Sequence, residues 1–260
     1  MLYIKMDKQP DNITCGPTSL QAVYDYFGDE IGLRQVIEEV HPISGGGTLA
    51  CFLGCHALAR NYSAITYSYD LQMFDPTWFQ SKNVDLHAKL VAQAKHKRKE
   101  KLLEATEGYL RFLDAGGKIL FQSLTTNLLR SILERDIPVI AGLSSTYLYQ
   151  SARTREDEDG NDIYDDVRGY PDGHFVVIAG YDDEGRIVVA DPYGHPKTGS
   201  TLYAVKVTRL INAILLGIVT YDANLLVIEP KTRSAGRKTE QKTLFVDESG
   251  YRGPAAAVSF

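Results

Sequence analysis

The spacing of apolar residues predicts an amphipathic helix near the N-terminus. Apolar side chains recur at the i, i+3, i+4 and i+7 positions of one helical face: Leu20, Val23, Tyr24 and Phe27. Gly28 follows as a stop signal, and Pro17 suits the first turn of such a helix. Cys15 therefore sits at or just before the helix N-terminus, where free amide N–H groups and aligned peptide dipoles favour a nucleophilic thiolate.

A second helix is predicted after the glycine run at residues 45–47. Apolar residues follow the run at helical spacing: Leu49, Phe52, Leu53, Ala57 and Leu58. The run lacks the Gly-Lys-Ser/Thr sequence of a phosphate-binding loop. We therefore interpret it as a turn, with Thr48 as the N-cap of the helix.

Residues 84–113 form a strongly charged segment with a helical pattern, which indicates an inserted helix or pair of helices. Basic residues gather in its middle: Lys95, Lys97, Arg98, Lys99 and Lys101. Such a patch suits an acidic partner, but a solvated helix face is the simpler interpretation.

The second half of the chain is predicted to supply most of the strands. A short strand over 118–122 and a helix over 126–135 precede a buried strand over 138–143. Two further β-rich runs, 174–181 and 186–191, are joined by Asp182-Asp183-Glu184-Gly185, which predicts a hairpin.

The register of this hairpin brings a histidine and a carboxylate together. A four-residue turn pairs Tyr181 with Arg186, and the same pairing places Asp191 opposite Val176, two residues from His174. His174 and Asp191 then project from one face as diagonal neighbours, and a bulge or a kink would close the gap between them. A carboxylate that bonds one imidazole nitrogen fixes the tautomer and leaves the other nitrogen free to act on a thiol.

Residues 153–172 form the most polar segment, with eight carboxylates against Arg153, Arg155 and Arg168. We expect a solvent-exposed loop. Because the loop ends beside His174, one interpretation is a lid that disfavours acidic substrates, and the other is a mobile acidic surface loop.

Composition and charge exclude several classes of protein. The net charge of −5 argues against a nucleic-acid partner, and no apolar stretch is long enough to span a membrane. The three cysteines do not form a disulfide framework, and the N-terminus lacks the basic and apolar regions of a signal peptide. We therefore expect a cytoplasmic protein.

A metal site is not expected. Cys51, Cys55 and His56 are the residue types that bind zinc, but His56 points about 100° away from Cys55 on a helix. We expect no metal and no cofactor.

Four motifs together resemble those of papain-like cysteine peptidases, closest to the bacteriocin leader-peptidase branch, the double-glycine peptidase-like domains. They are Gln9, Cys15-Gly16-Pro17-Thr18-Ser19, Gly173-His174-Phe175-Val176-Val177 and Ala190-Asp191-Pro192. The match follows chain order and extends to a final helix and strand between Thr208 and Glu229. It implies an α+β papain-like fold, with an N-terminal helical half and an antiparallel sheet half.

The resemblance also implies a role for each residue. Cys15 would be the nucleophile, His174 the general base and later acid, Asp191 the residue that orients His174, and Gln9 the oxyanion-hole donor. Cys15 lies six positions after Gln9, enough for the Gln9 side-chain amide to fold back beside the thiol.

These patterns predict a domain over 1–230, with a helical insertion at about 83–115, an acidic loop at about 151–172 and a polar tail over 231–260. The predicted function is a cysteine peptidase or amidohydrolase that cleaves a peptide or related amide bond of a peptide or protein substrate through an acyl-enzyme. Two alternatives remain: an acyl transferase with the same residues, and a catalytically silent peptide-binding module.

Overall fold

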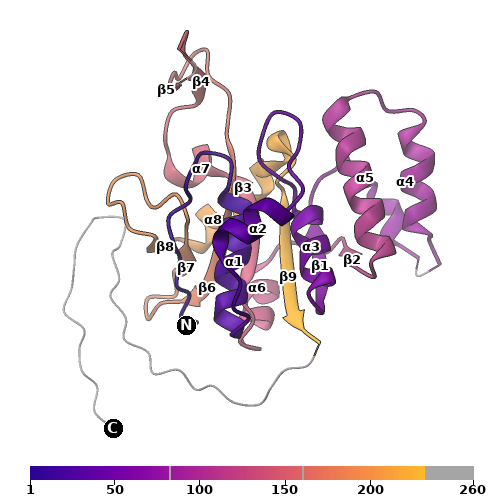
Figure 1. Cartoon of the computed structure of the whole chain (residues 1–260), viewed down its shortest axis with the longest axis horizontal. Coiled ribbons are helices and arrows are strands. Elements are labelled where there is room, and N and C mark those ends of the chain that lie inside the picture. Colours follow the sequence, from indigo (N-terminus) through magenta and orange to yellow (C-terminus); the bar gives the residue numbers. More distant parts are fainter. Residues whose placement is uncertain (82, 160, 232–260) are drawn as a thin grey trace.

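A seven-stranded sheet organises the part of the chain that the computed structural model describes, residues 1–81, 83–159 and 161–231 (Figure 1). Its strands run in the order β2-β1-β9-β3-β6-β7-β8, and neighbours are antiparallel except for the parallel pair β1 and β2. The bounds are β1 (Tyr62–Ser68), β2 (Lys118–Leu120), β3 (Val139–Ser144), β6 (Gly173–Tyr181), β7 (Ile187–Ala190), β8 (Leu202–Val205) and β9 (Asn224–Pro230). The predicted tail lies outside the described residues beyond Lys231.

Helices cover the sheet. They are α1 (Cys15–Phe27), α2 (Leu33–Glu39), α3 (Ala50–Ala59), α4 (Leu86–Ala94), α5 (Glu100–Asp114), α6 (Thr126–Leu133), α7 (Ser145–Tyr149) and α8 (Val207–Leu216), with short 3-10 turns η1 (Pro76–Phe79) and η2 (Gly217–Thr220). Helix α1 packs on β6, α3 on β1 and α8 on β3. Strands β3 and β7 are buried at every residue, so both faces of the central sheet are covered.

The α+β prediction is confirmed, but the division into a helical half and a sheet half is wrong in detail. Residues 62–68 form strand β1, which lies beside the C-terminal strand β9 in the same sheet. Alternate residues of β1 are fully buried, as expected of a strand with one face on a core. The segment is rich in Tyr, Thr and Ile, a composition typical of strands, although we predicted no strand there.

The predicted insertion is a pair of helices, and α5 is joined to the core through close contacts with α3. A Cβ atom on Gly54 of α3 would collide with the ring of Phe112, and one on Gly108 of α5 would lie 2.6 Å from the Cys51 sulfur. Glycine at both positions lets the helices approach closely. Figure 1 shows α4 and α5 side by side at one end of the molecule.

The prediction for the start of α3 is wrong. Leu49 is the N-cap residue, and no side chain caps the helix. The Thr48 hydroxyl instead donates a hydrogen bond to the His41 carbonyl, 2.8 Å away, and so closes the loop that contains the glycine run. Within the described residues, no helix is both long and apolar enough to cross a membrane.

Candidate active site

The N-terminus of α1 is held against β6 by close contacts that allow no residue larger than glycine at position 16. A Cβ atom on Gly16 would lie 2.6 Å from Thr48 Cγ2 and 3.3 Å from the Phe175 ring. The Ser19 hydroxyl donates to the Phe175 carbonyl at 3.2 Å. Cys15 is the first residue of α1 and His174 precedes Phe175, so this docking brings the thiol and the imidazole to the same place.

The β6–β7 hairpin has the predicted pairing near His174, but its turn is longer than predicted. Its turn has five residues, since Tyr181 pairs with Ile187 and Gly180 with Val188. If that register continued, Asp191 would lie on the opposite face from His174.

A bulge at Ala179 restores the predicted face. Ile178 pairs with Val189, so Ala179 is the extra residue on β6 and the register shifts by one. Val177 then pairs with Ala190, and the next position brings Asp191 to the same face as His174. Gly180 adopts a φ of 135°, a conformation that favours glycine, next to this bulge.

His174 and Asp191 are in direct contact. The Nε2 atom of His174 lies 2.8 Å from Asp191 Oδ1, and both side chains are buried. Because Nε2 is occupied by the carboxylate, Nδ1 is the nitrogen left for a thiol.

Asp191 accepts four further hydrogen bonds. The hydroxyls of Tyr149 and Tyr203 donate to Oδ2 at 2.8 and 2.6 Å, and the backbone amides of Tyr193 and Gly194 donate to Oδ1 at 2.9 and 3.4 Å. These donors fix the orientation of the carboxylate and thereby that of the imidazole.

The electrostatics of the pair favour a charged imidazolium beside a carboxylate. Burial opposes both charges, but the positive charge of His174 and the hydrogen bonds to Asp191 lower the pKa of this carboxyl. Burial also opposes protonation of His174, but the Asp191 charge and the interaction with the Cys15 thiol raise its pKa to about 10. Cys15 is partly exposed, and its thiol lies close enough to His174 to raise the pKa of the imidazole.

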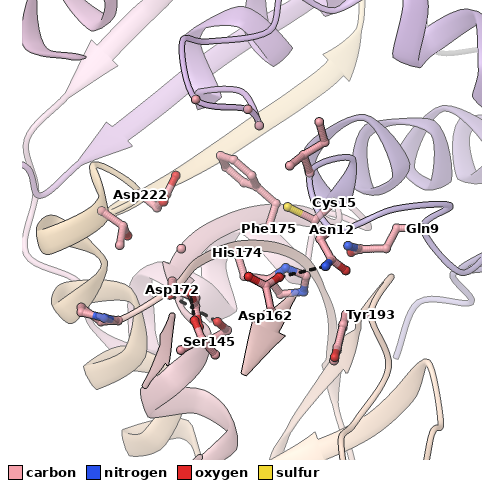
Figure 2. A pocket seen from close by; sticks show the side chains of 18 of the residues that line it. Gln9, Asn12, Cys15, Ser145, Asp162, Asp172, His174, Phe175, Tyr193 and Asp222 are labelled. Carbon is pink, nitrogen blue, oxygen red and sulfur yellow. Dashed lines mark hydrogen bonds between the residues drawn. The ribbon is translucent and has the colours of Figure 1, made fainter. Parts of the chain in front are cut away.

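Gln9 lies beside this group on a segment held by the hairpin. Its backbone amide donates to the Pro192 carbonyl at 2.9 Å, directly after Asp191. Its side-chain Nε2 donates to the Asp11 carbonyl at 2.6 Å and carries a second hydrogen for another acceptor. Figure 2 shows the Gln9 amide turned toward Cys15 and His174.

Gln9, Cys15 and His174 line a cavity of about 680 Å³. Glycines 45–47 line it, all with φ between 81° and 92°, so the run is a left-handed turn at the cavity edge rather than a phosphate loop. Tyr193 also lines the cavity, and 47% of its surface is exposed. Such a cavity has the size of a small-molecule or peptide-side-chain site.

The acidic segment is ordered into a small hairpin, so the prediction of a loop is incomplete. Strands β4 (Thr154–Glu156) and β5 (Asp162–Tyr164) pair, and Asp165 accepts hydrogen bonds from Arg155 and Arg168 at 2.9 and 2.7 Å. These bonds hold the pKa of Asp165 well below its usual range.

The hairpin also reaches the cavity. The Asn12 side-chain amide donates to Asp162 Oδ2 at 2.9 Å, across from the Cys15 helix. Asp162 and Tyr164 line the cavity together with Cys15 and His174. In Figure 1 β4 and β5 stand out from the sheet.

No group of three or more metal-ligating side chains occurs in the described part of the chain. Cys51 is fully buried, and His56 hydrogen-bonds the Tyr24 hydroxyl at 2.8 Å and Glu39 at 3.0 Å. Burial raises the pKa of Cys51 and that of Cys55, the latter to about 11. These two thiols are therefore poor nucleophiles.

Several residues of the site were not predicted from the sequence. Tyr149 belongs to the short helix α7 and Tyr203 to strand β8, neither of which we predicted. Asp222 and Lys101 line the far part of the cavity, whereas we expected Lys101 on a solvated helix face. The Tyr203 strand, Leu-Tyr-Ala-Val, carries a weak β signal, but no sequence pattern indicates what its hydroxyl contacts.

Comparison with known proteins identifies relatives of this chain. The model of the Peptidase_C39 like family matches residues 1–208. No curated protein matches the chain significantly. A crystal structure of a Bacillus anthracis protein, provisionally assigned as a C39-like peptidase, is 14% identical, with a TM-score of 0.44, and the alignment covers 89% of this chain and 97% of that one. The family match spans most of the sequence and includes Gln9, Cys15, His174 and Asp191, and the chain belongs to the Peptidase_C39 like family.

Proposed function

We propose that this protein is a cysteine peptidase that uses Cys15, His174 and Asp191 as a catalytic triad. The observation that carries the proposal is the His174 ring, which is held by Asp191 at 2.8 Å through Nε2 and interacts electrostatically with the Cys15 thiol in the same cavity. An acid, an imidazole and a thiol in this order activate the sulfur as a nucleophile. Family membership supports cysteine peptidase activity.

The first step is attack by the Cys15 thiolate on the carbonyl carbon of the scissile bond. The carbonyl π electrons move to oxygen, and the oxyanion accepts hydrogen bonds from the Gln9 side-chain amide and the Cys15 backbone N–H. The imidazolium of His174 then gives its proton to the leaving amine as the C–N bond breaks, which leaves an acyl-enzyme thioester.

Water completes the reaction. Neutral His174 takes a proton from the water as its oxygen attacks the thioester carbon, and the C–S bond breaks to release the carboxylic acid. Asp191 remains ionised throughout, since five hydrogen bonds hold its carboxylate.

The fold we propose for this catalytic unit is papain-like. Its elements are a helix that begins at the nucleophile, α1, and an antiparallel hairpin, β6–β7, that presents the histidine and the acid. The site lies where these two elements meet.

The test combines peptide cleavage with active-site labelling. The protein is incubated with a mixture of unstructured peptides, and products are identified by mass spectrometry for the native chain and for Cys15→Ala. We expect cleavage by the native chain only, and a thioester adduct on Cys15 at early times in quenched samples. Equal cleavage by Cys15→Ala would overturn the assignment of the nucleophile.

A further inference from the structure

The cavity extends beyond the triad to a second buried carboxylate, Asp222. In Figure 2 Asp222 lies on the side of Cys15 and His174 away from Gln9 and Tyr193. Only 7% of the Asp222 surface is exposed, and the residue lines the same cavity as the Cys15 thiol. No step of the proposed reaction uses it.

The backbone around Asp222 is built to leave space for this carboxylate. A Cβ atom on Gly173 would collide with Asp222 Oδ2, so only glycine at 173 allows the carboxylate to lie against the residue before His174. The preceding residue, Tyr221, has a φ of 68°, which turns the chain at the end of η2. The Asp222 amide donates to the Gly217 carbonyl at 2.9 Å and fixes this turn.

Asp222 lacks the partners that a structural carboxylate would have. The nearby Thr220 hydroxyl lowers the pKa of Asp222 but donates its hydrogen to the Gly217 carbonyl at 3.0 Å, and the structure shows no ion pair of Asp222 within the described residues. Lys101 of α5 exerts a favourable charge on it from a distance, but the Lys101 ammonium is bound to the Thr220 carbonyl at 3.2 Å and stacks on the Tyr221 ring at 5.2 Å.

The charges that line the cavity as a whole are mostly negative. Asp162 and Asp172 line it together with Asp222, against the single cation Lys101 among the described lining residues other than His174. Asp162 accepts a hydrogen bond from the Asn12 side-chain amide at 2.9 Å, and Asp172 accepts one from the Thr154 hydroxyl at 2.6 Å, so neither carboxylate is bonded to a cation there. A cationic group that enters the cavity would gain attraction from all three carboxylates.

We infer that Asp222 forms a specificity subsite for a basic side chain, lysine or arginine, of the peptide substrate near the scissile bond. This inference rests on the proposed function, because it names the substrate that the triad would cleave. A buried carboxylate with few internal donors gains a charge-assisted hydrogen bond only when a cationic ligand supplies it.

The ionisation of Asp222 makes the subsite dependent on pH. Burial raises the pKa of Asp222 to about 7, while Lys101, Thr220 and His174 act against the rise and Asp70 adds to it. The only other titratable group that interacts with it in the described structure is the buried Tyr109 hydroxyl, which is neutral in this range. The carboxylate is therefore present at pH 8 and largely protonated at pH 6.

The experiment uses N-acetylated, C-amidated, internally quenched octapeptides that are uncharged except at one position, which is either lysine or the isosteric norleucine. We measure kcat/KM for each pair at pH 8. At one position the native protein should prefer lysine about tenfold, and Asp222→Asn should reduce the ratio to about one. Asp166→Asn, an exposed carboxylate outside the cavity, controls for net charge and should leave the ratio unchanged.

One further variant and a pH comparison sharpen the test. Lys101→Met removes the competing cation and should raise the lysine preference, opposite to the effect of Asp222→Asn. For the native protein the preference should shrink from pH 8 to pH 6, and for Asp222→Asn it should not depend on pH. A lysine preference that survives in Asp222→Asn, or that is absent at every position, would overturn the inference while cleavage of the norleucine peptides upholds the peptidase.

Binding separates failure of the subsite from failure of catalysis. The same peptides are titrated into Cys15→Ala, and into Cys15→Ala combined with Asp222→Asn, with affinity read by fluorescence anisotropy. Tighter binding of a lysine peptide that depends on Asp222 supports the subsite even if the native chain cleaves nothing. Equal affinities for lysine and norleucine peptides overturn it.

Discussion

Two buried carboxylates, Asp191 and Asp222, lie near the same histidine, yet their surroundings differ. Asp191 accepts five hydrogen bonds, and its pKa is lowered although it is completely buried. Asp222 lies near the Thr220 hydroxyl, which donates to the Gly217 carbonyl, and farther from Lys101, and burial raises its pKa to about 7. Burial alone favours the neutral acid, so the positive charge of His174 together with the larger number of donors keeps Asp191 charged, whereas Asp222 titrates.

This difference assigns different tasks to the two groups. A carboxylate whose lone pairs are all occupied cannot bind a ligand, but it can hold a histidine in one orientation. A carboxylate with free lone pairs at a cavity wall can bind a cation from the substrate. Substitutions at the two sites should therefore affect different kinetic quantities.

The largest effect should come from Asp191→Ala. The change releases His174 and leaves the Tyr149 and Tyr203 hydroxyls without their acceptor, so kcat/KM should fall at least about a thousandfold for every peptide. Steady-state kinetics with a norleucine peptide measures this fall. Asp222→Asn is the matched control and should stay within about twofold on the same peptide, and an equal loss for both variants would remove the distinction between the two carboxylates.

Gln9→Ala should reduce kcat about a hundredfold, since one oxyanion donor is lost. The labelling of Cys15 by iodoacetamide should not change, because alkylation has no oxyanion. Comparison of the two rates in the same preparation provides the measurement. A parallel loss of labelling would show that Gln9 acts on the thiol or on the fold instead.

Tyr203→Phe tests how much the hydrogen bond from the Tyr203 hydroxyl to the Asp191 carboxylate stabilises the fold. The lost bond is 2.6 Å long and goes to an ionised acceptor, so the free energy of unfolding should fall by about 2 kcal/mol. Urea denaturation at pH 7 measures the change. Tyr170→Phe, at an exposed tyrosine, should have no effect, and a similar fall for both variants would contradict the role of the Tyr203 hydroxyl.

A further prediction is a pH dependence of stability that is specific to His174. The folded protein raises the His174 pKa to about 10 from about 6.5, so it binds the proton more tightly than the unfolded chain. The resulting stabilisation is fully present below pH 6.5 and is lost as the pH rises toward 10. Urea titrations of the native chain and of His174→Phe from pH 6 to 10 should converge at high pH, and a constant difference would contradict the raised pKa.

The sequence predicted that His174 and Asp191 lie on one face of the hairpin, and the structure brings them together, but the prediction rested on a partly mistaken reason. The face shared by His174 and Asp191 was predicted from a four-residue turn, whereas the structure has a five-residue turn and a compensating bulge at Ala179. Two departures, each of one residue, cancel in their effect on the alternation of the strand. Gly180, beside the bulge, was a signal that could have indicated it.

The remaining parts of the site depend on tertiary contacts that have no local pattern. Tyr203 reaches Asp191 from an adjacent strand, and Lys101 reaches the cavity from the helical insertion. The prediction that Thr48 caps the following helix was wrong. Its hydroxyl donates to the His41 carbonyl, seven residues earlier, and does not bond an amide of the helix. Local propensity can predict that an element exists, but it does not determine which partner a polar side chain meets.

The most direct test of the central claim is the rate of Cys15 alkylation by iodoacetamide at pH 7, resolved by mass spectrometry for each cysteine. The native chain should label Cys15 far faster than Cys51 or Cys55, and His174→Ala should lose at least about ninety per cent of that rate, because the imidazolium no longer stabilises the thiolate. If Cys15 reacts at the same rate with and without His174, the two side chains do not act together, and the chain is not the peptidase proposed here.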